Sequence, residues 1–169
     1  GALADPAAIL AHAIAAIVSP TGEILVEAWR PPPMSDAVRE ALSDVQLDGG
    51  ENGPEIDPDW GEPGLTPAEN VYAFNSFAVL AMKSGNPESP VNAIAPWARA
   101  HCQLRYIAGT DRDNIIPALR KHLADAGIDR VRVEPPPDRR SETRELDVGP
   151  ASPEIVEIEP LLFHQHLGV

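Results

Sequence analysis

The sequence predicts an α+β sandwich, in which helices cover one face of a largely antiparallel sheet. The first observation is the order of the patterned segments, which is helix, strand, strand, helix, strand. The second is the alternation along residues 97–108, where Ala, Cys, Leu and Tyr share one face and Arg, His and Gln share the other. The third is the turn-rich loop at residues 85–96, which joins this strand to an apolar strand before it.

Composition limits the classes of protein to consider. The chain has 169 residues, 43% of them hydrophobic, which is enough for one domain with its own core. It carries 26 acidic and 13 basic residues, a formal charge of -13, without a basic patch. This balance argues against nucleic acid or an anionic membrane surface as a partner. No apolar run is long enough to span a bilayer.

The two ends and the cysteine count suggest where the chain works. Cys102 is the single cysteine, so no internal disulfide forms and a reducing, cytoplasmic location is expected. The chain starts at Gly1 and shows no basic leader or cleavage pattern. We therefore expect a piece of a longer protein.

The first half of the chain begins with a helix and continues into a proline-rich connection. Asp5 and Pro6 form a helix start, as N-cap and first helical residue. A short strand is predicted at residues 23–29, and a second helix, capped by a serine, at about 36–45. Residues 48–66 are acidic and rich in Gly and Pro, and their carboxylates do not have the spacing of a calcium loop. We interpret this segment as a surface insertion.

The second half contains most of the predicted sheet. A capping-box pattern at residues 66–69 predicts a short helix. Residues 75–83 are apolar on both faces, which predicts a strand covered on both sides. A helix is predicted at 115–123 and a short strand at 131–133. Residues 154–159 alternate in the manner of an edge strand.

Four short motifs then follow one another in a fixed order. They are GNP at residues 85–87, PVNAIAP at 90–96, AHCQLRY at 100–106 and GTD at 109–111. In this order and spacing they resemble the dimerisation or lid domain of the zinc exopeptidase family. That family contains aminoacylase, acetylornithine deacetylase, succinyl-diaminopimelate desuccinylase, carnosine dipeptidase and the glutamate carboxypeptidases.

The resemblance covers residues 1–134. The opening GALADPAA is similar to the segment just after the family's His-Ser-Gly motif. An insertion at about residues 23–72 is similar to the longer insertion of the carnosine dipeptidase-like branch. Residues 135–169 depart from the family and form a divergent, Pro-rich acidic C-terminal tail.

The resemblance implies a ferredoxin-like lid, a two-layer domain with an antiparallel sheet of about four strands and helices on one face. Such a lid pairs with a second copy across a two-fold axis and lends side chains to an active site where two zinc ions lie in the catalytic domain. By motif position, Asn92 and Arg105 are the residues that hold the substrate carboxylate. A guanidinium offers a planar fork to a carboxylate, and an amide adds a donor. We expect both side chains at one end of the sheet, close enough to share one carboxylate.

Some parts of that family's machinery are absent from this sequence. The histidine that stabilises the oxyanion, and the first lid strand, would precede Gly1. No metal-ligand set is evident, so the chain is predicted to have no cofactor of its own and no activity alone. His164 and His166 offer only two imidazoles, and a zinc site needs three or four ligands, so we interpret them as part of a polar terminal tail. Cys102 lies on the apolar strand face and is predicted to be core.

Two functions of different classes remain open. The first is a lid or dimerisation domain of a zinc-dependent metallopeptidase or amidohydrolase acting on dipeptides or N-acyl amino acids. Its partners would be a second copy of the chain and the catalytic domain of the parent enzyme. The alternative is a free-standing α+β protein-interaction module without catalytic activity, since a fold alone does not fix a function. A His-Ser-Gly motif and metal ligands in the flanking sequence would favour the first.

Overall fold

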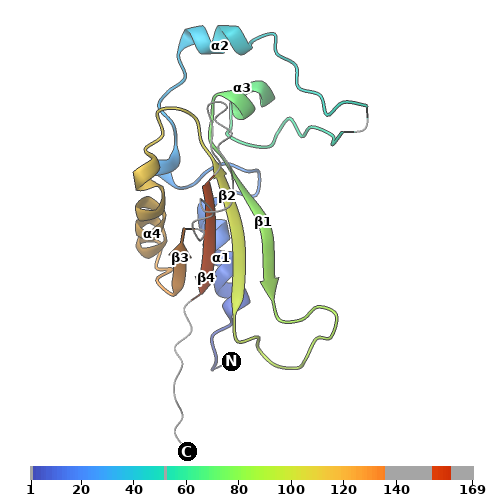
Figure 1. Ribbon diagram of the computed structural model, residues 1–169, viewed down its shortest axis with the longest axis vertical. Coiled ribbons are helices and arrows are strands. Elements are labelled where there is room, and N and C mark those ends of the chain that lie inside the picture. The colour runs from blue at the N-terminus through green and yellow to red at the C-terminus, as the bar shows by residue number, and fades with distance from the viewer. Residues whose placement is uncertain (1, 52, 136–153, 161–169) are drawn as a thin grey trace, which may run out of the picture.

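The structure of the protein is a computed structural model, which describes residues 2–51 and 53–135 in full and residues 154–160 as backbone (Figure 1). Its helices and strands follow one another along the chain. They are α1 (Pro6–Ile17), the 3₁₀ turn η1 (Glu27–Trp29), α2 (Asp36–Leu42), α3 (Pro67–Tyr72), β1 (Ser76–Ser84), β2 (Ala98–Arg105), the 3₁₀ turn η2 (Arg112–Asn114), α4 (Ile115–Asp125), β3 (Val131–Glu134) and β4 (Glu154–Pro160).

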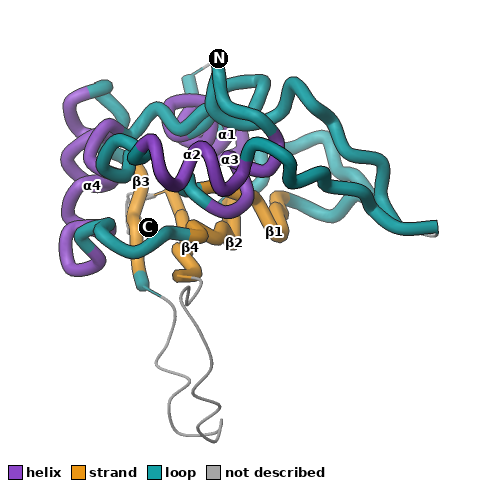
Figure 2. The backbone as a smooth tube through the Cα atoms, turned by 90° about the horizontal axis from the view of Figure 1, so that it is seen from above, coloured by secondary structure: helices purple, strands orange, loops and turns teal. Residues whose placement is uncertain are grey.

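The strands form one antiparallel sheet in the order β1-β2-β4-β3. Seen from above, α1 lies on one side of this sheet and α4 lies beside β3 (Figure 2). Helix α1 packs on β2, β3 and β4, and the apolar residues of α1, α4 and β2 form the core between the layers. The predicted α+β class, with helices against an antiparallel sheet, is confirmed. Helices α2 and α3 lie beyond the upper end of the sheet (Figure 1).

Strand β4 occupies a different place from the one that the sequence predicts. It is not an edge strand, because it pairs with β2 on one side (Cys102 with Val156) and with β3 on the other (Val133 with Ile158). Alternation reports the two faces of a strand and says nothing about how many neighbours it has. Part of the segment after Pro135 therefore belongs to the same sheet.

The predicted N-terminal caps of α1 and α3 are confirmed. The Asp5 carboxylate accepts a hydrogen bond from the backbone N–H of Ala7 at 2.9 Å. Thr66 and Glu69 form a complete capping box at the start of α3. Gly127 follows the last residues of α4 with φ +73°, the left-handed conformation that favours glycine after a helix.

The prediction of a strand at residues 23–29 is wrong. The structure has one isolated bridge there, Val18 with Ile24, followed by the turn η1. Ile24, Val26 and Trp29 are buried, so the apolar side chains of this segment pack into the core beside the sheet although the segment pairs with no strand. The predicted second helix is also shorter, ending at Leu42, and none of its residues is buried.

Strand β1 is the other departure. It was predicted to be covered on both sides, yet residues 78–83 are exposed and Phe77 is its one buried residue. A bulge explains the apolar pattern on both faces: Val79 pairs with Cys102 and Ala81 with the next residue, His101, so Leu80 is the extra residue. The alternation changes phase there, and β1 remains an open edge of the sheet.

The core is tied to the upper end of the sheet by Trp29 and Asn75. The Trp29 ring is fully buried, lies 5.8 Å from the Phe77 ring and donates through Nε1 to the Ile115 carbonyl at 2.9 Å. The buried Asn75 donates through Nδ2 to the Trp29 carbonyl at 2.5 Å and accepts at Oδ1 from the Ile107 N–H at 2.9 Å. One amide thus joins the start of β1, the chain just after β2 and the turn η1.

Asn75→Ala should destabilise the fold by about 2–4 kcal/mol, because it leaves several buried donors and acceptors without a partner. Urea denaturation followed by circular dichroism would measure the change. Asn114→Ala is the matched control: Asn114 is exposed and its side chain makes no capping hydrogen bond, so it should change stability by less than about 0.5 kcal/mol. Equal stability of the two variants would contradict the assigned role of Asn75.

Candidate functional site

A cavity of about 750 Å³ lies where the upper end of the sheet meets the insertion. Its volume falls in the range of small-molecule sites. The sheet side contributes Ser76 and Phe77 of β1 and Gln103 and Arg105 of β2. The insertion side contributes an apolar group: Leu47, Ile56, Trp60, Val71 and Phe74. The cavity is therefore formed mainly between residues 47–77 and the end of β2 at residues 103–107.

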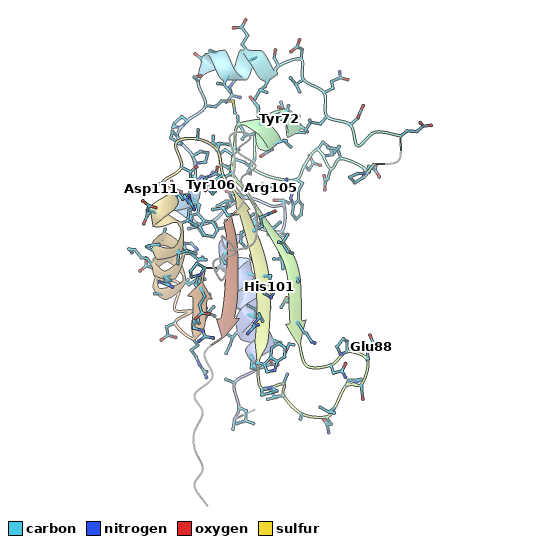
Figure 3. All side chains as sticks on the ribbon, in the orientation of Figure 1. Tyr72, Glu88, His101, Arg105, Tyr106 and Asp111 are labelled. Atoms are coloured by element: carbon cyan, nitrogen blue, oxygen red, sulfur yellow. The ribbon has the colours of Figure 1, made fainter. Side chains whose placement is uncertain are left out.

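Arg105 supplies the positive charge in this cavity. It is the last residue of β2, exposed on the polar face, and Figure 3 shows it near the upper end of the strand. Its Nε donates to Gln103 Oε1 at 3.3 Å, a bond that leaves the two terminal nitrogens of the guanidinium available. Among the described residues, no carboxylate lies within ion-pair distance of Arg105. The guanidinium is thus placed to receive a carboxylate from outside the chain.

Trp60 forms the outer wall of the cavity. Its ring sits on the bare backbone of Gly22, where an added Cβ would lie 2.6 Å from the ring, so only glycine fits there. The next residue, Gly61, donates its N–H to the Thr21 carbonyl at 2.7 Å, which fixes the loop against the start of the chain's core. Trp60 nevertheless stays 54% exposed. The Trp60 ring therefore presents a large apolar surface in the same cavity as Arg105.

Ion pairs fasten the rest of the insertion. Arg30 pairs with Glu62, donates to the Ile24 carbonyl at 3.0 Å and lies 5.8 Å from the centre of the Phe74 ring. Arg39 of α2 pairs with the buried Glu69 of α3 at 2.7 Å. These contacts connect the insertion to the core and join α2 to α3. The apolar residues that the insertion contributes to the cavity therefore have a defined position.

Asn92 does not join this site. It lies in the loop between β1 and β2, which enters β2 at Ala98, whereas Arg105 ends the strand. Seven residue steps separate the two ends of β2, about 23 Å in an extended strand. Figure 3 shows the loop, marked by Glu88, at the opposite end from Arg105. The prediction that the two side chains meet at one end of the sheet is wrong, because an extended strand separates them.

Sequence reasoning missed most of the cavity. Trp60 lies in the segment 48–66, which we interpret from the sequence as a surface insertion, and Gln103 is predicted only as a polar strand residue. Val71 and Phe74 follow that segment, and the sequence assigns them no site role. One signal was available: an aromatic residue between glycines and acids in a loop has no local reason to be there. The pairing of Trp60 with Gly22 is a tertiary contact that no local pattern reports.

The described residues do not fit a zinc centre. Across residues 2–51 and 53–135, no three His, Cys, Asp or Glu side chains gather closely enough to hold a metal ion. His164 and His166 lie outside the described residues. No described helix has the length and apolar character needed to cross a membrane.

Comparison with known proteins supports the fold. No family model matches the sequence, and no curated protein matches it either. Among solved structures, the M20 family metallo-carboxypeptidase Sso-CP2 from Sulfolobus solfataricus is similar, with a TM-score of 0.58 and 20% sequence identity. The match covers 75% of this chain and 30% of that one, so the chain spans under a third of the carboxypeptidase. The likeness shows that this chain has the fold of part of that protein.

Cys102 is not a nucleophile of the site, and its reactivity should show this. The side chain is fully buried, and burial raises its pKa to about 12. At pH 8 only about one thiol in 10,000 would be ionised, so a thiol reagent should modify the folded chain far more slowly than the chain in urea. Ser89→Cys, which adds an exposed thiol, is the control and should react at once with one equivalent. Equal rates for the folded and unfolded wild-type chain would contradict the assignment.

Proposed function

We propose that this chain is the lid or dimerisation domain of a zinc-dependent metallopeptidase or amidohydrolase, acting on dipeptides or N-acyl amino acids. The zinc ions belong to the catalytic domain of the parent enzyme. The lid supplies Arg105, which binds the carboxylate of the substrate. The observation that carries this proposal is the Arg105 guanidinium, which lines a cavity of small-molecule size and makes no ion pair among the described residues.

Two independent lines support the family. The motifs at residues 85–111 resemble the lid of the zinc exopeptidases, and the fold resembles part of an M20 metallo-carboxypeptidase. A carboxypeptidase acts on a chain that ends in a free carboxylate, which an arginine recognises with two parallel hydrogen bonds. Both lines therefore agree with the chemistry that the cavity offers.

The open edge of β1 provides the dimer contact. Val79, Leu80 and Met82 are exposed on a strand with an unpaired edge, so a second copy could extend the sheet and cover them. A two-fold axis perpendicular to the sheet would pair the two β1 strands antiparallel. The loop after Ser84 of one copy would then lie beside Ser76, the first residue of β1, of the other copy.

This arrangement gives Asn92 a role despite its distance from Arg105 within one chain. Ser76 pairs with Arg105 in the sheet, so a loop that lies beside Ser76 also lies near the arginine. Asn92 of one copy would reach the Arg105 cavity of the other and add a donor to the substrate. The proposed carboxylate site is thus shared between two copies.

In the full-length enzyme that carries this chain, Arg105→Ala should weaken substrate binding by about 2–5 kcal/mol, because it removes one partner of a charge pair. Arg105→Lys should recover only part of this loss, since an ammonium group cannot make the two parallel bonds. Steady-state kinetics would report the effect in kcat/KM. Arg130→Ala, an exposed arginine outside the cavity, is the control. Wild-type kcat/KM for Arg105→Ala would refute the role of Arg105.

Mixing two variants tests whether the site is shared. Asn92→Ala and Arg105→Ala enzymes are unfolded and refolded together, so that about half of the dimers are mixed. If one copy supplies Asn92 and the other Arg105, each mixed dimer has one intact site and about a quarter of the wild-type activity returns. If both residues act from one copy, every site keeps a defect and no activity returns.

Leu80→Glu should weaken self-association at least about tenfold, since it places a charge in the apolar contact. Analytical ultracentrifugation of the wild-type chain should show a dimer at micromolar concentration and the variant a monomer. Leu3→Glu changes an equally apolar residue, 76% exposed and outside β1, and should leave the dimer intact. A wild-type chain that stays monomeric at millimolar concentration would exclude the contact.

A further inference from the structure

The cavity offers more than a carboxylate site, because a bulky apolar wall stands beside Arg105. Trp60, in the insertion loop, and Val71, in α3, are 54% and 59% exposed, so each presents apolar surface to solvent. Both line the cavity together with Phe74. Exposed apolar surface gathered in a concave site is typical of a ligand-binding pocket.

The position of this wall is defined by contacts of its own. Trp60 rests on Gly22, and the Phe74 ring packs near the Arg30 guanidinium. Asn70, also in the cavity lining, accepts the Glu62 N–H through Oδ1 at 2.8 Å. The wall is therefore preformed, and a ligand would cover it without first ordering the loop.

The charges around the cavity limit the ligand further. Arg105 provides one positive charge, while Glu55 and Asp57 line the insertion side. A ligand with a second carboxylate would approach these acids in a chain whose formal charge is -13. The lining therefore favours one carboxylate next to an apolar group over two carboxylates.

We propose that the cavity selects carboxylate ligands with a bulky apolar or aromatic side chain, such as a C-terminal Phe, Leu or Trp residue. The carboxylate binds Arg105, and the side chain packs against Trp60, Val71 and Phe74. This selectivity rests on the proposed role of Arg105 in substrate binding. It assigns the insertion a function of its own, as the part of the lid that distinguishes one substrate side chain from another.

Titration calorimetry and amide NMR of this chain test the proposal with three probes. N-acetyl-phenylalanine should bind in the millimolar range and shift the Trp60 indole signal. N-acetyl-aspartate should bind roughly tenfold more weakly, because it buries no aromatic surface and adds a charge near Glu55 and Asp57. N-acetyl-phenylalaninamide, which lacks the carboxylate, should also bind at least about tenfold more weakly.

Two variants separate the apolar wall from the charge. Trp60→Ala should abolish the preference for the phenylalanine ligand over the aspartate ligand while binding remains dependent on the carboxylate. Trp97→Ala is the matched control, since Trp97 is 45% exposed and does not line the cavity. Arg105→Gln should make the phenylalanine acid and its amide bind equally.

The outcomes distinguish this inference from the proposed function. Equal, carboxylate-dependent binding of the phenylalanine and aspartate ligands overturns the selectivity and leaves the role of Arg105 standing. Equal binding of acid and amide to the wild-type chain overturns the role of Arg105 itself. No binding of any probe to the folded chain overturns the selectivity, because both walls of the cavity belong to this chain.

Discussion

The buried Asn75 side chain is the contact on which the upper half of the molecule depends. Its amide holds the Trp29 carbonyl on one side and the Ile107 N–H on the other. Ile107 follows Arg105 by two residues, so the same hydrogen bonds fix the direction in which β2 ends. A buried amide with every partner in place stabilises one arrangement of the surrounding chain, because any other would leave polar groups unpaired. The position of the backbone that carries Arg105 is therefore set from the core.

The insertion is built outward from this fixed end of the sheet. Arg30, next to Trp29, holds the insertion through Glu62, and Gly22 receives the ring of Trp60. The cavity thus has one wall in the sheet and one in the insertion, and both are joined to the same short segment of residues 22–30. A long surface loop can form part of a site when a rigid scaffold positions it, and Arg30 and Gly22 hold this loop to the core.

Local chemistry made much of the fold predictable. The N-caps at Asp5 and Thr66 and the alternation of β2 depend on neighbours in sequence, and each was found where expected. The wrong predictions concern features that tertiary contacts determine. Residues 23–29 alternate like a strand but find no strand partner, and periodicity could not show that β4 has two neighbours. Arg105 was identified as a candidate from its motif, whereas its separation from Asn92 follows from the length of β2.

The central place of β4 has a consequence for how the chain folds. Strand β3 takes its described pairing from β4, so β3 can join the sheet only after residues 154–160 have been synthesised. Of the described strands, the last to leave the ribosome is thus the one that joins the two halves of the sheet. Contacts between β2 and β4 span about fifty residues, and such long-range pairings slow folding. Until they form, one edge of β2 stays unpaired, and an unpaired strand edge can pair with a strand of another chain.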